Sequence, residues 1–190
     1  MSLKLITAPT EEPISLAEAR LHLRISDDVT DDDTLISALI AAARQGAEHI
    51  TQRALMAQTW ELALDEFEDE ILLPKAPLAS ITSVTYVDED GVSQSLTADD
   101  YQLDSHSEPA RLLPAYGTCW PATRAQANAV LVRYAAGYAS AAAVPQEIKS
   151  WMLLRVGLLY ENRESVVAGV SIAELPHVDR LLDAYKVWGA

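Results

Sequence analysis

Residues 134–148 read YAAGYASAAAVPQEI, and the type of secondary structure changes within this stretch. The run before it, 130–134, is rich in β-branched and apolar residues, which is typical of a strand. Small residues follow, and Pro145 suits the first turn of a helix, where its missing N–H costs no hydrogen bond. The sequence therefore predicts a link over residues 135–144 between a sheet and a helical layer.

Helical patterns occur on both sides of this link. Ser15 and Glu18 have the spacing of a capping box, which predicts the start of a short helix. From Thr34 to Ile50 apolar residues recur every three or four positions, a strong helix signal. Four helices are expected in all, over approximate residue ranges 16–24, 34–50, 145–162 and 176–188.

The middle of the chain has a different period. After about residue 53, apolar and polar residues begin to alternate, as in Trp60, Leu62 and Leu64. Prolines and an Asp90–Gly91 turn keep the expected strands short. The expected strands cover approximately residues 60–64, 71–73, 81–87, 92–96, 101–103, 111–113 and 129–134.

Grouped helices and grouped strands, without alternation, indicate an α+β fold. We expect a small helical bundle that carries a β-rich insertion of short antiparallel strands. The chain is interpreted as one domain over residues 1–190. Its parts are N-terminal helices over 1–53, the β-rich insertion over 54–134, and C-terminal helices over 135–190.

Composition narrows the function class. The net charge of −14 argues against a protein that wraps DNA, which requires a basic surface. The single cysteine, Cys119, excludes an internal disulfide. No signal-peptide pattern is found at the N-terminus, and no uncharged apolar run has the length of a membrane helix. We expect an acidic, soluble, intracellular protein.

The residue types that usually carry chemistry form no recognisable motif. The histidines are scattered, and Cys119 lies in a proline-rich stretch, which favours a passive role. Residues 27–33 read DDVTDDD but lack the glycine and the distal glutamate of a calcium-binding loop. Helix capping is the preferred interpretation of this cluster. We predict no catalytic residue, no metal site and no bound cofactor.

Acidic residues gather in the predicted insertion. Residues 54–104 contain twelve acidic residues and one basic residue, Lys75, so they carry −11 of the total charge. The densest group is Glu66, Glu68, Asp69 and Glu70, which we expect to be solvated and unpaired. One interpretation is a solvated outer face that keeps the protein soluble. The other is a surface that repels nucleic acid or meets a basic partner.

The helix after Pro145 has little polar surface. Residues 151–160 contain one charged side chain, although a surface helix normally has a polar face. Either this helix is central to the domain or another subunit covers it. The candidate residues for a subunit or portal interface are Trp151, Leu154, Leu158, Tyr185 and Trp188. For Trp151, a place in the core is an equally open alternative.

An ordered set of segments resembles the phage head–tail connector (adaptor) family of tailed phages and prophages. The segments are PISLAEARLHLRI, LISALIAAARQGAEHITQRAL, QTWELALDEF, ILLPKAPLASITSVTYVDEDG, AVLVRYAAGY, VPQEIKSWMLLRVGLLYENRE and LLDAYKVW. No single segment is diagnostic, but together they cover most of the chain in the order of the family.

This resemblance implies a structural subunit without enzymatic activity or cofactor. It implies self-assembly into a ring, usually of twelve subunits, beneath the portal protein. Such a ring extends the channel for DNA, which passes through without specific binding, and provides a surface for the tail or a stopper protein. The implied location is the virion neck, preceded by the cytoplasm of the bacterial host. The alternatives are another neck or tail-completion protein, such as a stopper, or a small acidic enzyme.

Overall fold

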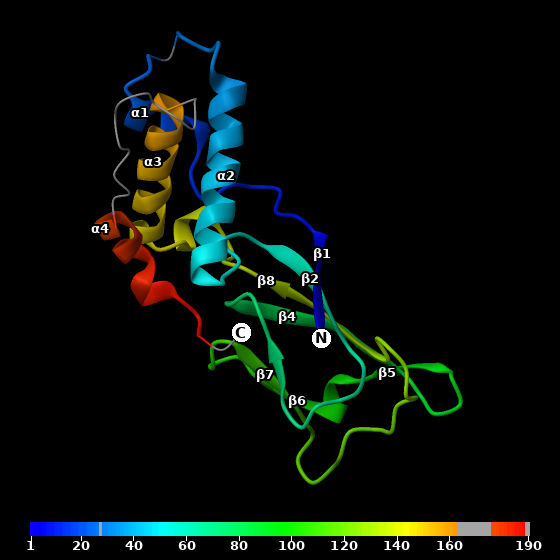
Figure 1. The fold of residues 1–190 in the computed structure, drawn as a ribbon. Coiled ribbons are helices and arrows are strands. Elements are labelled where there is room, and N and C mark those ends of the chain that lie inside the picture. Colours follow the sequence, from blue (N-terminus) through cyan, green and yellow to red (C-terminus); the bar gives the residue numbers. More distant parts are fainter. Residues whose placement is uncertain (27, 163–175, 189–190) are drawn as a thin grey trace. The chain divides into compact units, whose positions relative to one another are not determined.

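The computed structural model describes residues 1–26, 28–162 and 176–188, and it divides into two compact units (Figure 1). Unit 1 contains residues 1–10 and 52–139 and the C-terminal residues from Val187, and unit 2 contains residues 11–51 and 140–186. One boundary between the units falls inside the link predicted over 135–144. Helices and antiparallel sheets are both present, which confirms the α+β class.

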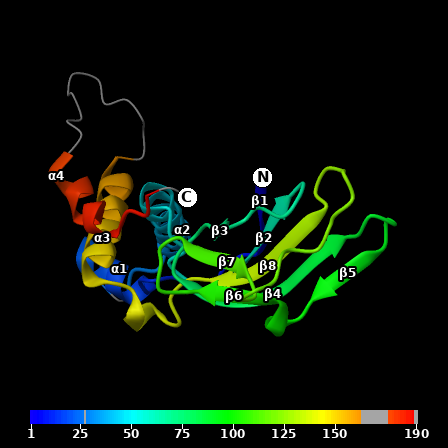
Figure 2. The same ribbon diagram turned by 90° about the horizontal axis from the view of Figure 1, so that it is seen from below.

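The larger sheet of unit 1 has five strands, and every neighbouring pair is antiparallel. In spatial order the strands are β1 (Ser2–Thr7), β2 (Gln58–Leu64), β8 (Val130–Ala136), β4 (Leu78–Val87) and β5 (Ser93–Leu96). The central strand β8 pairs with β2 on one side and β4 on the other, and β1 and β5 form the two edges (Figure 2).

The edge strand β1 was not expected from the sequence. Its partner β2 lies more than fifty residues further along the chain, so no local hairpin signal marks the pairing. Leu3 packs against the core of unit 1, whereas Leu5 and Ile6 are about 40% exposed. A strand with this much exposure lacks the alternation of buried and polar residues that identifies strands.

The smaller sheet of unit 1 has three antiparallel strands and confirms the predicted short strands. It consists of β3 (Ile71–Leu73), β7 (Ala110–Pro114) and β6 (Tyr101–Asp104), and the one-turn 3-10 helix η1 (Ala98–Asp100) precedes β6. Both sheets contribute to one hydrophobic core. Its buried members are Ala54, Leu62, Leu64, Ile71, Leu73, Val84, Ala110, Leu112, Val130, Val132, Tyr134 and Ala136.

The small residues after β8 have a steric explanation. Gly137 has a φ of +119°, and a Cβ at this position would lie 2.1 Å from the backbone oxygen of Met56. Just before it, the fully buried Tyr134 donates its hydroxyl to the carbonyl oxygen of Pro74 at 2.9 Å. Burial raises the pKa of Tyr134 above the ordinary tyrosine range. The chain therefore leaves the sheet through a position where a side chain has no room.

Unit 2 is helical. Its elements are α1 (Leu16–Leu23), α2 (Asp33–Thr51), η2 (Ala141–Ala143), α3 (Gln146–Glu161), α4 (Pro176–Asp179) and the 3-10 helix η3 (Arg180–Tyr185). The predicted capping box is confirmed, with the amide of Glu18 donating to Ser15 Oγ at 3.2 Å and the Ser15 amide donating to Glu18 at 2.7 Å. These hydrogen bonds from Ser15 lower the pKa of Glu18.

Two helix predictions need correction. Pro145 is the residue that precedes α3 and has extended backbone angles, so it lies outside the first turn. The last helix ends at Tyr185 instead of continuing to Trp188, and its second half is a 3-10 helix. Lys186 returns to an extended conformation, so Val187 and Trp188 are not helical. The sequence also predicts a loop over residues 164–174, and this segment lies outside the described residues.

The core of unit 2 forms where α1, α2 and α3 pack together. The buried apolar residues of α2 recur every three or four positions and form one stripe, which consists of Ile36, Ile40, Ala43 and Ala47. The buried members of this core are Ile14, Ala19, Ile36, Ile40, Ala43, Ala47, Val144, Ile148, Trp151, Met152, Val156 and Leu182. Part of the low polarity of α3 is thus explained by the residues of this helix that are buried in the core of unit 2.

Candidate interaction surfaces

The acidic segment, defined here as Glu66, Glu68, Asp69 and Glu70, lies in the connection between β2 and β3. Glu66, Glu68 and Asp69 are exposed, as predicted. Glu70 differs, because Arg111 on β7 lies 3.5 Å from its carboxylate. The expectation that all four are unpaired is therefore wrong for Glu70. Arg111 comes from forty residues further along the chain, so the local sequence contains no sign of this pair.

Aromatic packing holds the acidic segment in place. The ring of Phe67 stacks on Trp120 with centroids 4.8 Å apart, and it meets Tyr86 edge-on at 5.5 Å. The indole N–H of Trp120 donates to the backbone oxygen of Glu68 at 2.8 Å. The amide of Asn128 donates to Asp65 at 2.8 Å. The carboxylates next to Phe67 are thus presented outward from an anchored backbone.

Sequence reasoning missed the roles of Phe67 and Trp120. The available signal was the pattern Glu66-Phe67-Glu68, in which an apolar ring between two carboxylates marks an inward-facing position. Trp120 gave no comparable signal, because its proline-rich surroundings have no periodicity.

Arg111 also joins strands β7 and β6 of the smaller sheet. Its guanidinium donates to Asp104 Oδ2 on β6 at 2.7 and 3.0 Å. Asp104 accepts further hydrogen bonds from the hydroxyl of Ser107 at 2.7 Å and from the amide of His106 at 3.0 Å. These bonds, the one from Ser107 first and those from Arg111 next, hold the pKa of Asp104 well below its usual range. The oxygens of Asp104 already accept hydrogen bonds within unit 1, so this carboxylate has little capacity to bind a partner.

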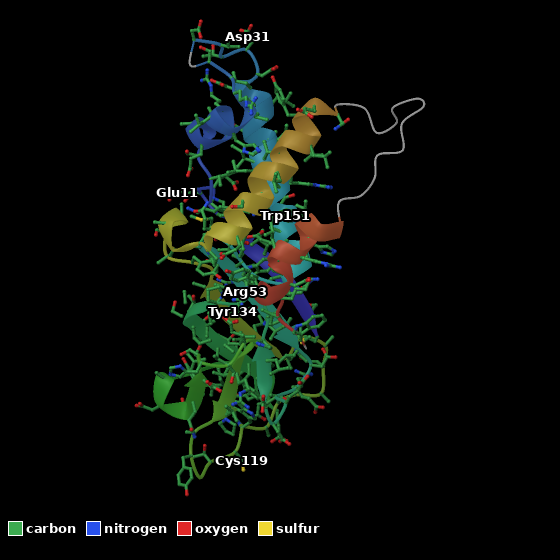
Figure 3. All side chains as sticks on the ribbon, turned by 90° about the vertical axis from the view of Figure 1, so that its left-hand side faces the viewer. Glu11, Asp31, Arg53, Cys119, Tyr134 and Trp151 are labelled. Carbon is green, nitrogen blue, oxygen red and sulfur yellow. The ribbon has the colours of Figure 1, made fainter. Side chains whose placement is uncertain are left out.

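A buried cation lies inside unit 1. Arg53 is 8% exposed and makes a two-pronged contact with Glu108, in which its Nη1 donates to Oε1 at 2.8 Å and its Nη2 to Oε2. Burial opposes the charge of Arg53, but the hydrogen bond to Glu108 and the nearby Tyr138 raise its pKa. The same hydrogen bond lowers the pKa of Glu108. Arg53 and Tyr134 are both interior residues of this unit (Figure 3).

The acidic loop before α2 is organised around an arginine. Arg20 is 9% exposed, and its guanidinium donates to the carbonyl oxygens of Ser26, at 2.8 Å, and Val29. Its Nη1 lies 3.4 Å from Asp33, the first residue of α2. Asp32 accepts a hydrogen bond from Tyr160 of α3. Asp32 and Asp33 therefore serve a side-chain contact and a helix end within unit 2.

The interface candidates on α3 have different environments. Trp151 is 3% exposed, packs 3.4 Å from the position of a Cβ on Gly46, and donates its indole N–H to Asp179 at 2.8 Å. In the single chain Trp151 is thus a core residue. Leu154 is 44% exposed and Leu158 is half-buried. Tyr185 is half-buried and donates its hydroxyl to Glu147 at 2.7 Å.

The C-terminal residues of unit 1 also separate into two environments. Trp188 is 78% exposed, while the preceding Val187 is 7% exposed. The sequence predicted that both residues lie at the end of the last helix. Because the backbone is extended here, consecutive side chains point in opposite directions. Trp188 keeps the exposure that an interface anchor requires.

Unit 2 contains an apolar pocket of about 370 Å³. It is lined by Glu11, Glu12, Ile14, Ser15, Leu16, Ser37 and Ile40. Most of its lining surface is contributed by apolar atoms. Glu12 is engaged by Arg44 at 2.8 Å. A pocket of this composition suits an apolar side chain rather than a reacting polar group.

Other chemistry-bearing residues stay apart. Cys119 is exposed on a loop remote from Arg53 and Tyr134 (Figure 3). Among residues 1–26, 28–162 and 176–188, no three His, Cys, Asp or Glu side chains are arranged to hold a metal ion. A search of the same residues finds no helix with the length and apolar character needed to span a membrane.

Comparison with known proteins identifies the family. The profile of the family described as "Phage gp6-like head-tail connector protein" matches residues 13–108, half of the chain. The chain belongs to this family. The matched region runs from the segment before α1, through the acidic segment, to Glu108. The connector is thus a structural subunit of the virion neck, and the resemblance noted in its sequence is confirmed.

Solved neck structures agree with this assignment. The connector is 27% identical to a chain in the neck of an empty gene transfer agent particle computed with C6 symmetry, with a TM-score of 0.80. The match covers 98% of the connector and 96% of that chain. A chain in the neck of a native particle computed with C12 symmetry is 26% identical over the same shares, with a TM-score of 0.75. No curated protein sequence matches.

Proposed function

We propose that the connector forms a ring of about twelve subunits beneath the portal protein, where it extends the DNA channel. The observation that carries the proposal is the match to neck chains over 98% of the connector. Those necks were computed with C6 and C12 symmetry, which supports repetition around an axis. A closed ring repeats one heterologous interface, so each subunit must present two different and complementary surfaces.

The exposed carboxylates suit a subunit beside moving DNA. Glu66, Glu68 and Asp69 point outward from a backbone that Phe67 and Trp120 anchor. Phosphates find no counter-charge on such a surface, so DNA passes it without being retained. Repeated around a ring, the segment contributes a fixed negative field. The proposed role is repulsion, with no specific DNA binding.

The proposed partners are the portal on one side and the tail or a stopper protein on the other. The exposed Trp188 supports a docking role for the C-terminal residues, because aromatic anchors dominate many interfaces. Assembly takes place in the host cytoplasm before the subunit becomes part of the neck. We propose no reaction and no cofactor for this structural subunit.

Imaging with the portal tests this function. Purified connector is mixed with purified portal and with purified tails in separate samples, and each is examined by negative-stain electron microscopy. We expect rings stacked coaxially on the portal. Attachment to tails with no attachment to portals supports a stopper-like subunit instead. Absence of rings in every sample, at all protein concentrations, contradicts the ring.

The isolated connector should associate weakly. The candidate residues of α3 are partly shared with the core, which leaves a modest patch for a neighbour. Modest patches give weak pairwise contacts, and ring closure or a template adds avidity. Sedimentation velocity should show monomers at low concentration and rings at high concentration or on the portal. A sharply defined dimer at every concentration points to an isologous patch and contradicts this expectation.

A further inference from the structure

The hydroxyls that line the apolar pocket of unit 2 are already occupied. Ser15 Oγ lies 2.7 Å from Glu18 as part of the capping box, and Ser37 Oγ donates to the Asp33 carbonyl oxygen at 2.8 Å. Glu12 is engaged by Arg44. Apart from these, the lining offers the apolar atoms of three aliphatic residues and the exposed carboxylate of Glu11. The chemistry that fits is an aliphatic side chain accompanied by a cation.

The exposed part of α3 beside Trp151 offers this combination. Leu154 is 44% exposed, Arg155 is exposed and Leu158 is half-buried. Leu158 lies four residues from Leu154 and three from Arg155, so the three side chains are neighbours on the helix surface. We call Leu154, Arg155 and Leu158 the α3 patch. Its composition is complementary to the pocket in both apolarity and charge.

The pocket and the contact surface for α3 lie on opposite sides of α2. Gly46 of α2 faces Trp151 of α3, whereas Ser37 of α2 lines the pocket. Nine residues separate Ser37 from Gly46, which in an α-helix is about two and a half turns. The two positions therefore point in opposite directions from the helix axis. Glu11 lies at the side of the helical unit, while Trp151 lies among its helices (Figure 3). A head-to-tail contact requires two different surfaces on each subunit, and the pocket and the α3 patch are two such surfaces.

The exposed Leu21 fits the pocket less well than the α3 patch. Leu21 is 80% exposed but lies on α1, whose first residue, Leu16, lines the pocket. If Leu21 of one subunit entered the pocket of another, α1 of each subunit would contact α1 of the other. Such a contact is nearly self-complementary and produces a twofold dimer instead of a ring.

We propose that the α3 patch of one subunit enters the apolar pocket of the next, with Arg155 against Glu11. The proposal rests on the ring proposed above and names the interface that this ring repeats. Burial of the leucines supplies the apolar contact, and the ion pair fixes which surface meets which. The proposed contact also explains why α3 has few polar side chains among the residues that lie outside the core of unit 2.

Charge exchange tests the pairing. Glu11→Arg and Arg155→Glu should each reduce ring formation at least tenfold, measured by sedimentation velocity at high concentration and by imaging on portals. The double variant should recover ring formation to within about threefold of the wild type. Asp31→Arg and Arg180→Glu change exposed charges elsewhere in unit 2 and serve as matched controls. Equal ring formation by all of these variants overturns the pairing while leaving the ring intact.

Cross-linking gives a second test that does not depend on loss of assembly. On a Cys119→Ser background, a Leu154→Cys variant is mixed with a Ser37→Cys variant under oxidising conditions. We expect cross-linked dimers in the mixture and none in either variant alone. Cross-links in the Leu154→Cys variant alone indicate a twofold contact and overturn the proposal. If wild-type protein forms no ring on the portal, the proposed function itself fails, and this interface fails with it.

Discussion

Unit 1 contains thirteen acidic and six basic residues, and unit 2 contains fifteen and eight, so each unit carries a net charge of −7. The two units arrange this charge differently. In unit 1, Arg53 pairs with Glu108 and Arg133 with Glu61, both far away in sequence, and Arg111 pairs with Asp104 on the neighbouring strand. Glu66, Glu68 and Asp69 remain as an exposed group.

In unit 2 much of the acidic charge has local structural tasks. Glu18 caps α1, Asp33 begins α2, and Glu147 lies in the first turn of α3 and accepts from Tyr185. Unit 2 also presents the exposed Leu154 and the apolar pocket near Ile14, beside exposed charges such as Arg155 and Arg180. The comparison shows that net charge alone does not indicate a surface. Unit 1 concentrates exposed carboxylates in its acidic segment, whereas unit 2 uses several carboxylates for contacts within its own fold.

The largest expected effect concerns the core of unit 2. Trp151→Ala removes a buried ring and leaves Asp179 without its donor, so it should lower the free energy of unfolding by about 3–5 kcal/mol. Denaturant unfolding with hydrogen exchange will show whether unit 2 alone is affected. Trp151→Phe, which keeps most of the ring, is the matched control. Unchanged stability combined with loss of ring assembly places Trp151 in the interface and reverses our assignment.

A smaller effect is expected from the buried ion pair of unit 1. Glu108→Gln should cost about 1–2 kcal/mol, because it weakens a charged hydrogen bond to Arg53 while Glu108 itself is partly exposed. The effect should depend on pH. The pair lowers the pKa of Glu108, so its contribution is complete above the ordinary glutamate pKa of 4.5 and is lost as pH falls through the lower value in the folded state.

Stability measured from pH 6 down to pH 3 checks this prediction. The difference in unfolding free energy between wild type and Glu108→Gln should shrink as the pH falls, because the glutamate becomes neutral in both the folded and unfolded chains. A difference that stays constant over this range shows that the loss comes from packing and not from the ion pair.

Trp188 tests the C-terminal residues of unit 1 as a docking element. Trp188→Ala should weaken attachment to the portal at least tenfold, about 1.4 kcal/mol, and change stability by less than about 0.5 kcal/mol because the side chain is 78% exposed. A single substitution is preferable to truncation, since Val187 is 7% exposed and its removal lowers stability. A lower melting temperature with unchanged portal affinity shows that Trp188 stabilises the fold instead.

The smallest effect on stability is expected from the acidic segment. Replacing Glu66, Glu68 and Asp69 with Lys should change the unfolding free energy by no more than about 0.5 kcal/mol. It should create an affinity for duplex DNA that falls with added salt. Glu70 is left unchanged because it pairs with Arg111, and a Glu70→Lys variant serves as a contrast that disturbs the smaller sheet. Wild-type binding to DNA at physiological salt contradicts the repelling role.

Local sequence patterns predicted most of the helices and strands, but they did not predict the tertiary contacts that these elements make. The period of α2, the capping box of α1 and the alternation in β2 all depend on near neighbours, so they were visible in the sequence. Strand β1 was missed because its partner is remote and its side chains are exposed. The spacing of Leu181, Leu182 and Tyr185 suggested a helix to Trp188, but the chain becomes extended at Lys186.

The candidate interaction surfaces were harder to predict than the helices and strands, because they depend on contacts between residues distant in sequence. Composition identified the acidic segment, but the cation that neutralises Glu70 comes from another strand. Trp151 and Leu154 are three residues apart on one apolar helix, and only packing against Gly46 and Asp179 separates the buried residue from the exposed one. The pocket that receives our proposed contact could not be inferred, because α2 and the segment before α1 line it jointly.

The order in which unit 2 is assembled along the chain has a consequence during translation. Its long helix α2 ends at Thr51, and its partner α3 begins at Gln146, after nearly the whole of unit 1. At about 5–20 residues per second, the ribosome needs about 5–20 s to synthesise the intervening stretch. For that time Ile36, Ile40 and Ala43 lack the helix that completes their core, so newly made subunits present an apolar helix to chaperones and proteases before they become able to assemble.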